Sequence, residues 1–252
     1  MTILDVPGPV TPSHLAATPL ADFRHPSLVQ LVDARGWRDA DNSARIGAAY
    51  TFVKDEIPFG YNRSDDLPAS AVLADGYGQC NTKGTLLVAL LRALAIPCRV
   101  RGFTIDKALQ RGAIPEWMYP FAPSRILHSW VEVHHEGAWT PLEGFILDDA
   151  YLHALQRRFA DVRGPFCGYG VATKDLHDPP VTWCGRPTYI QREGIVDDFG
   201  VFDSPDALYA ERGTNLRGLR RLLYAYVLRH AMNRVVRRVR LASSTPTPAL
   251  VR

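Results

Sequence analysis

The most constraining feature of this sequence is a glycine-rich turn that leads a cysteine into an apolar helical run. The turn spans Gly76 to Gly78, Cys80 follows it, and leucines recur at helical spacing until Ile96-Pro97 ends the pattern. A helix N-terminus presents free backbone N–H groups and a positive dipole, and both favour the thiolate, the nucleophilic form of cysteine. We therefore predict that Cys80 is a reactive nucleophile; the competing interpretation is a small buried cysteine with a structural role.

Two downstream segments supply the partners that a nucleophilic thiol needs. Residues 127–134 alternate between two faces as a strand does, and they include His128. The turn Glu136-Gly137 then leads towards Glu143, so an antiparallel hairpin would place Glu143 beside His128. A thiol, an imidazole base and a carboxylate that orients the base form the generalised catalytic triad. Asp148, a little further along the chain, is a competing acceptor for the imidazole.

Several segments together resemble the transglutaminase-like superfamily. The resemblance rests on Tyr50 to Tyr61, Gly78-x-Cys80, Leu90 to Gly102, His128-Ser-Trp-Val-Glu-Val and Gly137 to Glu143. These segments lie within residues 44–149, about two fifths of the chain. The resemblance implies a papain-like α+β fold and a triad of cysteine, histidine and aspartate in this chain order. By motif position it implies Cys80 as the nucleophile and His128 as the base, with Glu143 in the place usually held by aspartate.

Residues close to the cysteine are candidates for stabilising a developing oxyanion. Gln79 offers an amide group next to the Cys80 N–H, and Tyr61 offers a hydroxyl instead. Residues 81–83 occupy the first turn of the predicted helix, where they either cap the helix at the surface or take part in binding.

A long aromatic connection separates the first predicted strand from the histidine strand. It runs from Ile105 to Ile126, which is longer than two adjacent strands need. We predict that this connection forms an apolar wall over the cysteine site. Trp117 and Tyr119 are then candidate substrate-binding residues, together with Trp130 of the histidine strand. The alternative is a hydrophobic patch that packs on the sheet.

Composition and cysteine usage restrict the remaining classes of protein. The chain has 252 residues, of which 46% are hydrophobic, enough to bury a core and too many for a disordered chain. Its four cysteines include no Cys-x-x-Cys pair, so we expect no disulfide framework, no metal site and no cofactor. The first 27 residues are rich in proline and lack a secretory pattern, which favours a cytoplasmic location.

The C-terminal segment is strongly basic. From Arg212 to Arg252 it contains ten arginines and no acidic residue, a charge of +10 against −7 for the rest of the chain. Three interpretations are a helix that lies on the acidic remainder, a membrane-surface helix, and a docking face for an acidic partner such as a carrier protein. Nucleic acid is the least favoured partner. No apolar run reaches the roughly 20 residues that a membrane span requires.

The predicted organisation has four parts: an extended arm at 1–27, a transglutaminase-like catalytic domain at 28–211, an arginine-rich helix at 212–241 and a disordered tail at 242–252. The predicted function is acyl-enzyme chemistry on an amide, thioester or ester carbonyl of a peptide or acyl substrate. The acyl group then passes to water, as in a peptidase or amidase, or to an amine, as in amide formation or cyclisation on a carrier-bound chain. The alternative is a catalytically inactive relative that binds a peptide or serves as a scaffold.

Overall fold

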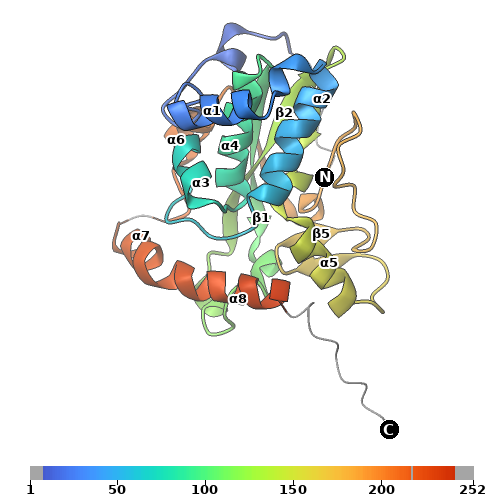
Figure 1. Cartoon of the computed structure of the whole chain (residues 1–252). Helices are drawn as coiled ribbons and strands as arrows, with labels where there is room; N and C mark the ends of the chain where they lie inside the picture. Colours follow the sequence, from blue (N-terminus) through green and yellow to red (C-terminus); the bar gives the residue numbers. More distant parts are fainter. Residues whose placement is uncertain (1–7, 217, 242–252) are drawn as a thin grey trace.

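A four-stranded antiparallel sheet forms the centre of the fold (Figure 1). The structure is a computed structural model that describes residues 8–216 and 218–241. In the spatial order β3-β2-β1-β6, the strands are Ala138–Leu142, Arg125–His135, Cys98–Asp106 and Ile195–Phe202. A separate two-stranded sheet pairs β4 (Phe166–Gly168) with β5 (Val171–Thr173). Helices pack on the central sheet, so the predicted α+β class is confirmed.

The helix α4 (Cys80–Ala93) is the central helix. Every residue of α4 after Cys80 is buried, because the helix contacts β1 and β2 as well as three other helices. Those helices are α1 (Pro26–Ala34), α2 (Asn42–Thr51) and α3 (Ala69–Asp75). A helix enclosed in this way needs apolar residues on most of its circumference, which the leucines of α4 provide. The predicted core helix is confirmed, and Cys80 is its first residue.

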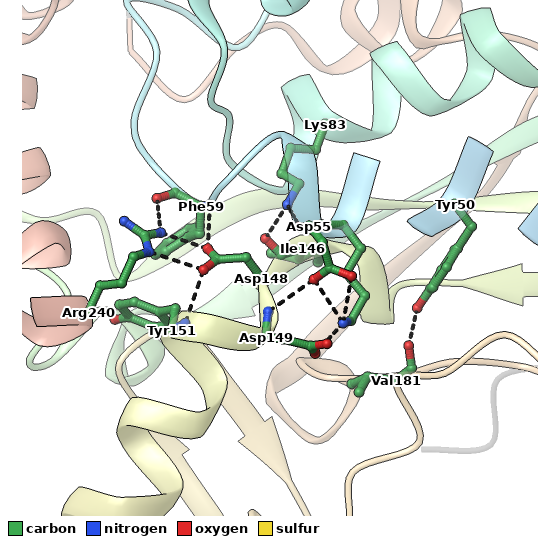
Figure 2. Close-up of polar contacts among 11 residues, drawn as sticks. Tyr50, Asp55, Phe59, Lys83, Ile146, Asp148, Asp149, Tyr151, Val181 and Arg240 are labelled. Atoms are coloured by element: carbon green, nitrogen blue, oxygen red, sulfur yellow. Dashed lines mark hydrogen bonds and ion pairs between the residues drawn. The ribbon is translucent and has the colours of Figure 1, made fainter. Parts of the chain in front are cut away.

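Lys83 corrects the expectation of a surface cap in the first turn of α4. Its side chain is fully buried, and Nζ donates to the carbonyl oxygens of Lys54 at 3.1 Å and Ile146 at 3.0 Å (Figure 2). Burial lowers the pKa of Lys83 to about 7, although the nearby carboxylates of Asp148 and Asp55 oppose the shift. The lysine therefore links α4 to the segments before and after it in the sequence.

The hairpin that follows the histidine is confirmed. β2 and β3 pair in antiparallel register, with Val131 opposite Leu142. Glu136 and Gly137 form the turn with positive φ angles of 49° and 81°, the backbone geometry that suits a tight hairpin. Glu143 follows directly after β3, so the hairpin returns the chain to the part of β2 that holds the histidine.

The connection between β1 and β2 is shorter than predicted. β1 continues to Asp106 and β2 begins at Arg125, and Ile105 pairs with Ile126 across the two strands. The connection therefore spans residues 107–124, and it contains two short 3-10 helices, Lys107–Gln110 and Tyr119–Phe121. Extension of the strands accounts for the difference.

The C-terminal helices lie along the base of the molecule in the view of Figure 1. After α5 (Asp149–Arg158) and α6 (Pro205–Arg212), the chain forms α7 (Gly218–Leu223), a π-helical turn at Tyr224–Leu228 and α8 (Arg229–Leu241). α8 packs on α5, and Arg240 of α8 forms an ion pair with Asp148 at 2.6 Å. This packing fits the interpretation of a helix that lies on the acidic remainder.

No helix within 8–216 or 218–241 is long and apolar enough to cross a membrane. The four-part division of the chain stays a prediction. The predicted disordered tail at 242–252 and the first seven residues of the predicted arm lie outside the described residues.

Candidate active site

Backbone hydrogen bonds fix the turn that presents Cys80. The Gly78 N–H donates to the Pro58 carbonyl at 3.1 Å, and the Gly78 carbonyl accepts from the Gly60 N–H at 2.9 Å. A Cβ atom at Gly78 would lie 2.8 Å from the side chain of Lys83, so the close approach of the turn to the helix requires glycine. The Cys80 thiol emerges half-buried from this turn. As the first residue of α4, Cys80 also has a backbone N–H that the helix does not use.

His128 and Glu143 form a buried pair. Both side chains are completely shielded from solvent, and Nε2 of His128 lies 2.7 Å from Oε1 of Glu143. The other ring nitrogen, Nδ1, is buried and has no hydrogen-bond partner of normal geometry among the described residues. The ring also interacts with the side chain of Cys80. Because Glu143 holds Nε2, Nδ1 is the nitrogen left to exchange a proton with Cys80.

The charges around the imidazole favour its protonated form. Burial disfavours the imidazolium, but Cys80 and Glu143 together outweigh burial and raise the pKa of His128 to about 9. The ring is therefore a cation at neutral pH. Because the pKa of His128 in the folded protein is higher than the ordinary 6.5, protonation of its ring stabilises the fold. This stabilisation is fully present below pH 6.5 and is lost as the pH rises through about 9.

We expect His128 to titrate near pH 9 in NMR spectra of the isotope-labelled protein. Cys80→Ser and Glu143→Gln should each lower this pKa, because either change removes a side-chain interaction that favours the imidazolium and leaves the effect of burial less opposed. A titration midpoint at or below the ordinary value of 6.5 in the unmodified protein would contradict this electrostatic account. The resonance that is lost in His128→Gln is then assigned to His128.

Two backbone N–H groups anchor Glu143 from its other side. Oε2 of Glu143 accepts from the N–H groups of Ile190 and Gln191, each at 2.9 Å. This anchoring directs Oε1 at the imidazole and fixes the orientation of the ring. The competing carboxylate, Asp148, instead forms its ion pair with Arg240. Of the two carboxylates, Glu143 is therefore the one that contacts the imidazole.

Asn81 connects the cysteine helix to the histidine strand. Its Nδ2 donates to the Leu127 carbonyl at 3.0 Å, and its Oδ1 accepts from the Ser129 hydroxyl at 3.0 Å. These two partners flank His128 in the sequence, so Asn81 holds the strand on both sides of His128. The side chain is buried, which excludes the surface capping role and makes Asn81 a positioning residue.

Gln79 uses both of its amide groups within the turn. The side-chain oxygen accepts from the Asn62 N–H at 2.8 Å, the side-chain nitrogen donates to Asp65 at 3.1 Å, and the backbone N–H donates to the Thr82 hydroxyl at 3.0 Å. The backbone N–H and the side-chain oxygen are therefore engaged, and the side-chain nitrogen is directed at Asp65 within the turn. These contacts differ from the predicted oxyanion role: Gln79 supports the turn that presents Cys80.

The second predicted support, Tyr61, lies at the site. It lines the same cavity as Cys80, and its ring packs on Phe59 with the ring centroids 5.5 Å apart. Burial, and next the charge of Cys80, raise the pKa of Tyr61. Its hydroxyl therefore stays protonated and remains able to donate a hydrogen bond.

Cys80 opens into a cavity of about 1030 Å³. The connection between β1 and β2 forms one part of its wall, and another part is formed by Leu216 and by the C-terminal helical segment from Gly218 to Met232. A cavity of this volume lies at the upper end of the range found for small-molecule binding sites. The sequence alone does not predict that this helical segment is part of the site. An amphipathic pattern shows that a helix has an apolar face, but it does not show which part of the protein that face covers.

The three predicted substrate-binding aromatics have different positions. Trp117 lines the cavity and is 62% exposed. Tyr119 is not among the residues that line it; its ring lies against the Arg111 guanidinium, 4.4 Å from the ring centroid. Trp130 is also absent from the wall, since it is only 1% exposed and packs against Phe103 at a centroid distance of 4.3 Å. The predictions for Tyr119 and Trp130 are therefore corrected, because other residues cover these rings.

Comparison with known proteins shows that part of the chain is similar to one protein family. Residues 33–144, which include Cys80, His128 and Glu143, match the model of the Transglutaminase-like superfamily. A solved structure described as a "Putative Cysteine Protease from Cytophaga hutchinsonii" aligns with a TM-score of 0.45 and 12% identity, over 80% of this chain and 48% of that chain. This chain thus spans about half the length of that neighbour. No curated protein matches this chain. Residues 33–144 of the chain thus carry its similarity to the transglutaminase-like superfamily.

Proposed function

We propose that this protein is a cysteine-dependent acyl-transfer enzyme in which Cys80, His128 and Glu143 are the catalytic residues. The observation that carries the proposal is the buried pair of His128 and Glu143, whose free ring nitrogen serves a cysteine that opens into a cavity. The superfamily match supports cysteine-based catalysis in general terms. The individual steps follow from the geometry of the site.

The first half-reaction forms an acyl-enzyme. The Cys80 thiolate attacks the carbonyl carbon of an amide, thioester or ester, and the carbonyl oxygen becomes an oxyanion. The Cys80 N–H and the Tyr61 hydroxyl are the donors available to stabilise that oxyanion. The bond to the leaving group then breaks, and the His128 imidazolium gives its proton to the departing nitrogen, sulfur or oxygen. Glu143 keeps the ring oriented and stabilises its positive charge.

The second half-reaction releases the acyl group. Neutral His128 removes a proton from water or from an amine, and the resulting nucleophile attacks the thioester carbon and expels the Cys80 thiolate. Transfer to water makes the protein a peptidase or amidase. Transfer to an amine makes it an acyltransferase, including one that forms or cyclises an amide on a carrier-bound chain. The arginines of α7 and α8 suit an acidic carrier protein as the partner.

Product analysis tests this function. The protein is incubated with acyl thioesters in the presence and absence of a primary amine, and free acid and amide are quantified by mass spectrometry. We expect turnover that is lost in Cys80→Ala, and the ratio of amide to acid identifies the preferred acceptor. Absence of any Cys80-dependent product from thioester, ester and amide substrates would favour the alternative of an inactive binding protein. The cytoplasmic location stays a prediction.

A further inference from the structure

We propose that the acyl group is a long apolar chain, bound in the cavity between the 107–124 connection and the C-terminal helical segment. This inference rests on the proposed acyl-enzyme function and specifies its substrate class. The first observation is the composition of the walls. Ile114 and Met118 lie in the connection, and Leu228 and Met232 in the helical segment, and all four line the cavity into which Cys80 opens.

Several polar groups near the cysteine are engaged with one another, while the buried Oε1 of Gln191, which also lines the cavity, has no hydrogen-bond partner among the described residues. Asp65 accepts from the Gln79 side chain at 3.1 Å and from the Asn215 side chain at 2.9 Å. Asn215 in turn accepts from the Leu127 N–H at 2.7 Å, and Asn81 holds the histidine strand. Each of these polar residues lines the cavity. The hydrogen bonds among Asp65, Gln79 and Asn215 compete with hydrogen bonds to a peptide backbone, whereas a hydrocarbon chain needs only apolar contact.

The helical wall is firmly attached to the site. The Asn233 side chain forms two hydrogen bonds with the backbone of Tyr61: Oδ1 accepts from the Tyr61 N–H at 2.7 Å, and Nδ2 donates to the Tyr61 carbonyl at 3.0 Å. Arg229 donates to the hydroxyl of Tyr77, which lies within the turn that presents Cys80, at 2.8 Å. These hydrogen bonds hold the helical segment in place as a wall of the cavity. Its cavity-lining side chains therefore limit the length of the acyl chain that the cavity can bind.

The exposed lining of the cavity contains large apolar side chains beside the exposed Arg63, Arg220 and Arg221. Trp117 and Phe121 are 62% and 84% exposed, and Leu223 is 50% exposed. All three line the cavity. Exposed large apolar side chains at the entrance of a site are typical of surfaces that receive an apolar ligand. They provide a path by which a hydrocarbon chain leaves its carrier without full exposure to water.

The rates at which thioesters of different acyl-chain length acylate Cys80 test the inference. The Cys80 thiolate attacks the thioester carbon of acetyl-, hexanoyl- or decanoyl-N-acetylcysteamine, the carbon–sulfur bond of the donor breaks, and the His128 imidazolium protonates the departing thiolate to give free N-acetylcysteamine. Intact-mass spectrometry follows the acyl-enzyme over time. We expect decanoyl transfer to be faster than acetyl transfer by about tenfold or more, because each buried methylene favours binding.

Narrowing the cavity should reverse this preference. Leu228→Trp should lower the ratio of decanoyl to acetyl rates by roughly tenfold, and Ile114→Trp should do the same from the opposite wall. Leu222→Trp is the matched control, because Leu222 belongs to the same helical segment, is 54% exposed and is not among the cavity-lining residues. Thermal unfolding of each variant confirms that it is folded.

The outcomes separate the two proposals. Equal rates for all three thioesters would overturn the long-chain substrate class and leave the acyl-enzyme function standing. Failure of every thioester, and of the corresponding esters and amides, to acylate Cys80, in a protein whose Cys80 still reacts with iodoacetamide, would overturn the proposed function and this inference with it. A chain-length preference that persists unchanged in both wall variants would show that the cavity does not bind the chain.

Discussion

Replacing His128 with alanine should slow formation of the acyl-enzyme at Cys80 by roughly a thousandfold or more. The variant lacks the group that takes the proton from Cys80 and later protonates the leaving group. Glu143→Gln should also lose roughly a hundredfold or more, because a neutral amide cannot stabilise the imidazolium. The measurement is the single-turnover rate of acylation, followed by intact mass.

His134→Ala is the matched control for this prediction. His134 lies on the same strand, and its ring contacts Trp139 at a centroid distance of 5.2 Å. Its replacement should leave the acylation rate within about twofold, since surface substitutions away from the site have small effects. An acylation rate that survives His128→Ala, or that falls equally in His134→Ala, would refute the assignment of the base.

The second large effect concerns the ion pair between Arg240 and Asp148. Asp148 is buried, accepts two hydrogen bonds from Arg240 at 2.6 and 3.0 Å, and accepts one more from the Phe59 N–H at 2.9 Å (Figure 2). Arg240→Met should lower the free energy of unfolding by about 3 kcal/mol, because it leaves a buried carboxylate without its cation. Denaturant unfolding measures this change.

Hydrogen exchange on α8 gives a second readout of the same variant. We expect faster exchange throughout α8, since the ion pair holds the helix against α5. Arg238→Met is the control: Arg238 is exposed on the same helix, so its replacement should change stability by no more than about 0.5 kcal/mol. Equal losses in the two variants would show that the ion pair contributes no special stability.

The dependence of the free energy of unfolding on pH in the acid range should also reveal the ion pair between Arg240 and Asp148. Burial alone would raise the pKa of Asp148, but the hydrogen bonds and charge of Arg240 outweigh it and lower the pKa below the ordinary 3.8. The carboxylate therefore stabilises the fold above pH 3.8, and this contribution is lost as the pH falls through the lower folded-state value. The stability difference between the unmodified protein and Arg240→Met should accordingly shrink in acid.

The elements that position Cys80, His128 and Glu143 could be predicted because their signals are local. The glycine turn and the leucine periodicity placed Cys80 at a helix start. Alternation and a two-residue turn predicted the hairpin that brings Glu143 to His128, although Asp148 remained a competing carboxylate. That choice required tertiary structure, since Arg240 lies 92 residues from Asp148 and nothing local links the two.

Burial of single side chains could not be predicted in the same way. Lys83 occupies a first helical turn, where lysine is usually solvated, and only the fold supplies the two carbonyl acceptors that make its burial tolerable. Trp130 shares the strand pattern of His128, but Phe103 and Tyr189 cover it. A strand pattern assigns a residue to a face, whereas the elements that cover the face come from distant parts of the chain.

The most direct test of the account is to locate the acyl group after a single turnover. The protein is mixed with decanoyl-N-acetylcysteamine, quenched in acid and analysed by intact mass and by mass spectrometry of its peptides. The account predicts one added decanoyl group, carried by Cys80, released by hydroxylamine and absent from Cys80→Ala. An unmodified Cys80, or a decanoyl group on another residue that persists in Cys80→Ala, would contradict it.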